Sequence, residues 1–144
     1  MIEQDTVKLL RECDAGITMG IDSIGDVLDR VESAPLHQTL TRCQQEHQKL
    51  QAEVNSLLEQ YQDDGKAPNP IAKGMSWMKT NMKMTLEGSD ATVADLMTDG
   101  CNMGVKSLNK YLNQYEAADE KSKDITKRLI KLEQQLICDL QCYL

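Results

Sequence analysis

Three side chains of types that bind metal ions are spaced so that a helical bundle would bring them to one level. They are His47, Cys101 and Glu133. Imidazole, thiolate and carboxylate groups together suit Zn²⁺ or Fe²⁺. A further carboxylate, from Asp22 or Glu46, is expected close to this level. The alternative interpretation is structural, with a buried His47 hydrogen-bonded to a polar neighbour and Cys101 as a small packing residue.

The level of these residues follows from four long segments in which apolar residues recur at alternating steps of three and four. This period predicts helices over about 2–33, 35–62, 90–115 and 119–143. Ser33-Ala34-Pro35 predicts the break between the first two, because Pro35 cannot continue one helix but can start the next. Asp119 is the expected N-cap of the last helix. Counted from the break at 33–35, the three candidate ligands lie at nearly equal depth.

The segment from 63 to 89 predicts one more, shorter helix, with Asn69 as its N-cap and Pro70 at its first position. At about 1.5 Å per residue it would run back along most of the bundle, so the second and third long helices would be parallel. Trp77 and Met84 lie one heptad apart on one face of this helix. Exposed Trp is favoured at interfaces, which predicts a homodimer or another protein partner held through these two residues.

One phrase occurs twice in the chain, as G-I-T-M-G-I-D-S-I at 16–24 and as G-C-N-M-G-V-K-S-L at 100–108. The constant offset of 84 residues indicates two related halves, each a helix–turn–helix unit. Glycine inside a helix costs about 0.5–1 kcal/mol relative to alanine, so these glycine pairs need a compensating role. The expected role is close approach of helix backbones, and the alternative is room for a ligand or a metal cluster.

These features together resemble the ferritin-like superfamily, and more closely a bacterial branch of ferritin-like domains without assigned function. The resemblance rests on the two glycine pairs, on a crossover with Pro70, Gly74 and Trp77, and on Asp90 ahead of the second pair. It spans nearly the whole chain. It implies a single all-α domain over residues 1–144, a four-helix bundle of two antiparallel hairpins joined by a crossover with an extra short helix.

The chain departs from the superfamily's di-iron pattern, which places Glu on two helices and Glu-x-x-His on the other two. No Glu-x-x-His occurs in the sequence. Ile17 and Cys101 stand where relatives often have a carboxylate. Di-iron oxidase chemistry is therefore not expected, since a fold can be inherited without its activity.

Composition narrows the function further. A net charge of −7 and 3% aromatic residues argue against a nucleic-acid binder. No signal peptide or membrane span is predicted, so a cytoplasmic protein with free thiols is expected. A Cys₃His site from Cys43, His47, Cys138 and Cys142 is a weaker metal hypothesis.

The sequence thus predicts a non-catalytic module that oligomerises or binds a partner, its ancestral metal centre lost or altered. The alternative is a metal-binding or redox protein that uses His47, Cys101 and Glu133. Neither a nucleophile motif nor a phosphate-binding loop is present in the sequence.

Overall fold

Four long α-helices make up most of the computed structural model, which describes residues 2–61 and 89–144. They are α1 (Ile2–Leu28), α2 (Ala34–Gln60), α4 (Asp90–Gln114) and α5 (Glu120–Leu140), and a short 3₁₀ helix, η1 (Gln141–Tyr143), follows. The described residues contain no strand, which confirms the predicted all-α class. The predicted short helix of the crossover, with Trp77 and Met84, lies outside them.

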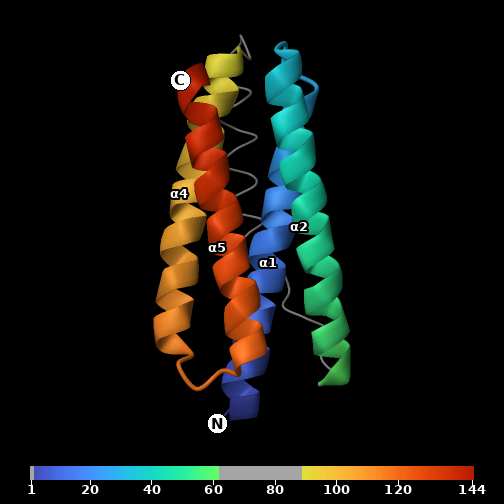
Figure 1. Ribbon diagram of the computed structural model, residues 1–144, viewed down its shortest axis with the longest axis vertical. Coiled ribbons are helices and arrows are strands. Elements are labelled where there is room, and N and C mark those ends of the chain that lie inside the picture. Colours follow the sequence, from blue (N-terminus) through green and yellow to red (C-terminus); the bar gives the residue numbers. More distant parts are fainter. Residues whose placement is uncertain (1, 62–88) are drawn as a thin grey trace.

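The helices lie side by side as two pairs (Figure 1). From the N-terminus at the lower end, α1 leads to the upper end, where the turn at 29–33 connects it to α2. The second pair begins at the upper end with α4, turns at 115–119 at the lower end, and returns as α5. Partners within a pair therefore run in opposite directions, whereas α2 and α4 run in the same direction.

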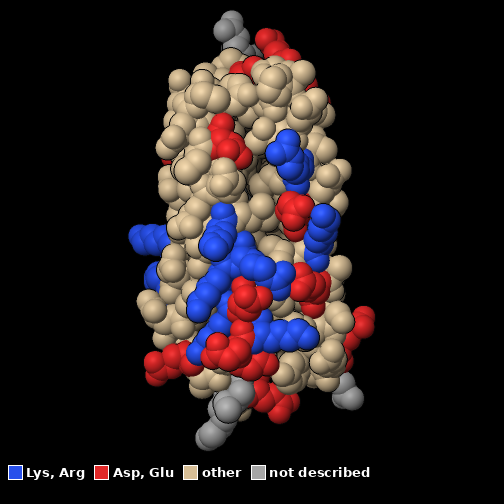
Figure 2. All heavy atoms as spheres, in the orientation of Figure 1, with Lys and Arg blue, Asp and Glu red and all other residues tan. Residues whose placement is uncertain are grey.

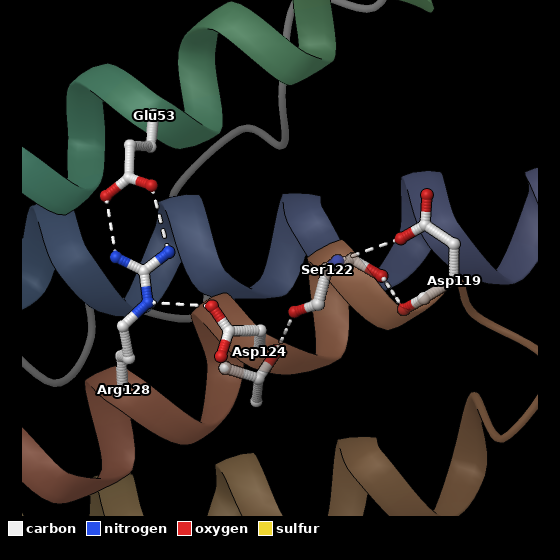
Figure 3. A network of polar contacts seen from close by, with 6 residues as sticks. Glu53, Asp119, Ser122, Asp124 and Arg128 are labelled. Atoms are coloured by element: carbon white, nitrogen blue, oxygen red, sulfur yellow. Dashed lines mark hydrogen bonds and ion pairs between the residues drawn. The ribbon is translucent and has the colours of Figure 1, made fainter.

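Side-chain caps begin three of the helices. The Ser33 and Ser89 hydroxyls accept backbone N–H groups at 3.3 and 3.2 Å to open α2 and α4. Asp119 accepts the Ser122 N–H at 2.8 Å, as predicted (Figure 3). The first helix was expected to continue to about residue 33 but ends at Leu28. Extended backbone at Ser33, which the cap of α2 requires, does not allow α1 to continue to that residue.

Each turn also donates hydrogen bonds to the start of a helix in the other pair. The carboxylate of Asp90 accepts the backbone N–H groups of Glu32 and Ser33 in the 29–33 turn, at 2.8 and 3.1 Å. The 115–119 turn donates to Asp5 at 3.1 Å and to the Thr6 hydroxyl at 2.8 Å. Thr6 and Asp90 are related by the offset of the repeated phrase, so both halves make the same kind of contact.

The buried apolar side chains form two clusters, one toward each end of the bundle. The upper cluster is built around Ile24, Leu36, Leu40, Val93, Met97, Leu136 and Leu140. The lower cluster is built around Leu10, Ile17, Val54, Leu108, Ile125 and Leu129. Two buried polar side chains, His47 and Glu133, belong to neither cluster and come from positions between the two sets. The middle of the bundle is thus its polar level.

Charged side chains of both signs share the face formed by α2 and α5. Lys and Arg gather in the lower half of this face, with Asp and Glu among them (Figure 2). Arg128 makes two 2.9 Å hydrogen bonds to Glu53 of α2 and one of 3.0 Å to Asp124 (Figure 3). Because both side chains are exposed, the ion pair between Arg128 and Glu53 stabilises the fold by at most about 1 kcal/mol. Among the described helices, none combines the length and apolar character needed to cross a membrane.

Candidate ligand-binding site

A cavity of about 230 Å³ lies between α1 and α4 at the polar level of the bundle. Both copies of the repeated phrase line it, through Gly16, Met19, Gly20 and Ser23 of α1 and Gly100, Met103, Gly104 and Ser107 of α4. His47 of α2 and Glu133 of α5 line it from the opposite side. The two copies of the repeated phrase therefore form two walls of one site.

His47 reaches this cavity because Gly20 has no side chain. A Cβ atom at Gly20 would lie 2.7 Å from both Cδ2 and Nε2 of the imidazole. The ring is 2% exposed, and its Nδ1 lies 2.8 Å from the Cys43 carbonyl oxygen. Nδ1 must donate there, because a carbonyl only accepts, and burial lowers the pKa of His47 and keeps the ring neutral. Nε2 is then an acceptor, buried and without a partner among the described residues.

Glu133 occupies the equivalent place beneath the second glycine pair. A Cβ atom at Gly104 would lie 2.5 Å from Oε2 and 2.9 Å from Oε1 of its carboxyl group. The side chain is 8% exposed, and Oε2 has no hydrogen-bond partner in the described structure. Burial raises the pKa of Glu133 to about 8.

The glycines therefore act differently from the close backbone contact expected of them. At Gly20 and Gly104 the nearest atoms belong to side chains of the partner helix, His47 and Glu133, and not to its backbone. Gly16 has only Leu129 nearby, with 3.9 Å to Cδ2. The space at Gly20 and Gly104 is taken by protein side chains, which neither the expected role nor its alternative had named.

Three predicted metal ligands, His47, Cys101 and Glu133, all line the cavity. Asp22 is not among the residues that line it, whereas its neighbour Ser23 is. The described residues contain no group of three or more His, Cys, Asp or Glu side chains placed to hold a metal ion. The described residues therefore give the predicted Zn²⁺ or Fe²⁺ site no support.

The weaker Cys₃His hypothesis also lacks support, because Cys138 and Cys142 are exposed whereas Cys43 is buried beside His47. The partner-binding role of Trp77 and Met84 lies outside the described residues and stays a prediction.

The burial of the cysteines predicts a simple labelling result. In the native protein a disulfide reagent should modify only Cys138 and Cys142, which are exposed. Cys13, Cys43 and Cys101 are buried and have raised thiol pKa values, about 12 for the first two, so they should react only after denaturation. Mass spectrometry of the labelled chain identifies the sites, and rapid native labelling of Cys101 would contradict the described packing.

Comparisons with protein-family models, with curated proteins and with solved structures found no match for this chain.

Proposed function

We propose that this chain is a non-catalytic, ferritin-like helical bundle that binds a small, largely apolar molecule between its two repeated phrases. One observation carries the proposal: a central cavity walled by both copies, with His47 Nε2 and Glu133 Oε2 beside it and unpartnered in the described structure. A buried polar atom without a hydrogen bond costs about 1–3 kcal/mol. A ligand that supplies the missing partners would remove that cost.

The volume sets the size of the molecule. An apolar cavity of about 150 Å³ accommodates benzene, so about 230 Å³ suits a ligand of roughly ten non-hydrogen atoms. The walls are mainly apolar, with Met19, Met97, Met103, Ile24, Leu108 and Leu136 among them. Most pockets for small molecules combine such walls with a few polar groups that set orientation.

The shared direction of α2 and α4 and the repeated turn-to-helix contacts support the ferritin-like part of the proposal. Members of that superfamily build metal sites from inward-pointing side chains at the middle of the bundle. In this chain the same level holds a cavity, and the described residues around it form no cluster of three or more potential metal ligands. The proposal therefore replaces an ancestral metal centre with a binding pocket.

Nuclear magnetic resonance of ¹³C-methyl methionine tests the proposal, because Met19, Met97 and Met103 line the cavity. We expect benzene, indole, phenethylamine or 2-phenylethanol at millimolar concentration to shift these three methyl signals.

A filled cavity is the matched control. Ser107→Leu places a larger side chain in the cavity wall, and Ser56→Leu makes the same change at an exposed position of α2. Binding should be lost in the first variant and retained in the second. Absence of binding by every compound, or equal binding by both variants, would overturn the proposed function.

A further inference from the structure

We propose that the ligand is a small apolar amine, bound as its ammonium cation through His47, Glu133 and Ser23. This inference rests on the proposed function and adds the chemical class of the ligand. It follows from the hydrogen-bonding character of the cavity: among the described residues that line it, His47 Nε2 and the ionised Glu133 carboxylate accept hydrogen bonds and no Lys or Arg donates.

The first acceptor is Nε2 of His47. Its role is fixed by the other ring nitrogen, which donates to the Cys43 carbonyl at 2.8 Å. A neutral imidazole with a protonated Nδ1 has a lone pair on Nε2 and no proton to donate from that atom. The group that meets His47 in the cavity must therefore be a donor.

The second acceptor is the carboxyl group of Glu133, from the opposite pair of helices. Its Oε2 is buried and unpartnered among the described residues, and no Lys or Arg appears among the described residues that line the cavity. On the neighbouring helices Glu133 is electrostatically coupled to the thiols of Cys13, Cys43 and Cys101, which cannot supply a positive charge. The described lining residues supply no cation for the ionised carboxylate, and we assign that role to the ammonium group of the ligand.

Ser23 provides a third polar atom. Its hydroxyl oxygen is buried, lies on the cavity wall and lacks a partner in the described part of the structure. The three atoms come from α1, α2 and α5, and an ammonium group carries three N–H donors. A carboxylate ligand would instead meet the acceptor Nε2 and the Glu133 carboxyl group without a compensating cation.

The apolar walls specify the remainder of the molecule. Three methionine thioethers, from Met19, Met97 and Met103, line the cavity, and sulfur makes favourable contacts with aromatic rings. The net charge of −7 also favours the approach of a cation over that of an anion. An alkyl or arylalkyl amine of roughly ten non-hydrogen atoms matches both the walls and the volume.

Three ligands that share a phenylethyl group test the inference. They are phenethylamine, 2-phenylethanol and 3-phenylpropionate, which are a cation, a neutral alcohol and an anion. Titration calorimetry is done with the reduced protein at pH 8.5. At this pH the amine is charged, and the pH lies above the pKa of about 8 of Glu133. We expect phenethylamine to bind about tenfold or more tightly than the alcohol, with the anion weakest.

Two variants test which side chains cause the preference for the amine. Glu133→Gln should reduce the preference for amine over alcohol to about threefold or less, and His47→Asn, which removes Nε2, should weaken amine binding. Circular dichroism checks that each variant is folded.

The outcomes separate the two proposals. Equal binding of amine and alcohol by the wild type overturns the amine assignment but leaves the pocket in place. Tighter binding of the anion overturns it as well. If none of the three ligands binds, and benzene and indole do not bind either, the proposed function itself fails.

Discussion

Gly20→Ala is expected to destabilise the protein by about 1–3 kcal/mol, although alanine is the better helix former. The added Cβ would lie 2.7 Å from two atoms of the His47 ring. The ring cannot turn aside without straining its 2.8 Å hydrogen bond to the Cys43 carbonyl, because Nδ1 is part of the same rigid plane. Chemical denaturation followed by circular dichroism gives the free energy of unfolding.

Gly16→Ala is the matched control, one helical turn earlier on α1. A Cβ at Gly16 would make only an ordinary contact, 3.9 Å from Leu129 Cδ2, so helix propensity should stabilise this variant by about 0.5–1 kcal/mol. Gly104→Ala should lie between the two, since the crowded atoms are the carboxyl end of a flexible Glu133 side chain. Stabilisation by Gly20→Ala would show that the glycine is not needed to admit His47.

The helices could be predicted from sequence because their limits are set by local chemistry. Asp119 and Pro35 mark helix starts through interactions made within one turn, and the structure places α5 and α2 accordingly. The predicted end of α1 was wrong because it, too, depends on the local chemistry of a helix start, here that of α2. Val31 continues the apolar stripe, but the need for extended backbone at Ser33 ends α1 at Leu28.

The depth of the candidate site along the bundle could be predicted, but not which side chain of each helix lines it. Counting depth along straight helices brought His47, Cys101 and Glu133 to one cavity. The rotation of each helix about its axis is set by packing against distant segments, and adjacent residues differ by about 100° around the helix. Asp22 was therefore expected where Ser23 is found.

The role of the glycines could not be read from one helix alone. A glycine pair indicates that space is needed, but the group that fills the space comes from another helix. His47 fills it beneath Gly20 and Glu133 beneath Gly104, at sequence distances that no local pattern reports. The repeat contains a usable signal, because two equivalent glycines indicate that a side chain of another helix lies against each of them.

Glu133 should also make the stability of the protein fall as the pH rises. Its pKa is about 8 in the folded state against 4.5 when exposed, so between these values the folded protein holds a proton that the unfolded chain has lost. Stability is full below the lower value and is lost as the pH rises to the upper one. Between pH 6.5 and 8.5 we expect a loss of about 2 kcal/mol in the free energy of unfolding.

Glu133→Gln should abolish this loss, because the amide has the shape of the protonated acid and does not ionise. Unlike most changes to a buried side chain, it should make the protein more stable than wild type at pH 8.5. Within the chosen window Glu133 dominates: the lowered pKa of His47 reduces stability mainly below about 6.5, and the raised pKa values of Cys13, Cys43 and Cys101 act mainly above about 9 and equally in both proteins. Glu120→Gln, at an exposed position of α5, should keep the wild-type profile. A flat wild-type profile, or lower stability of Glu133→Gln at pH 8.5, would mean that the Glu133 carboxyl has a charged or hydrogen-bonded partner in the folded protein.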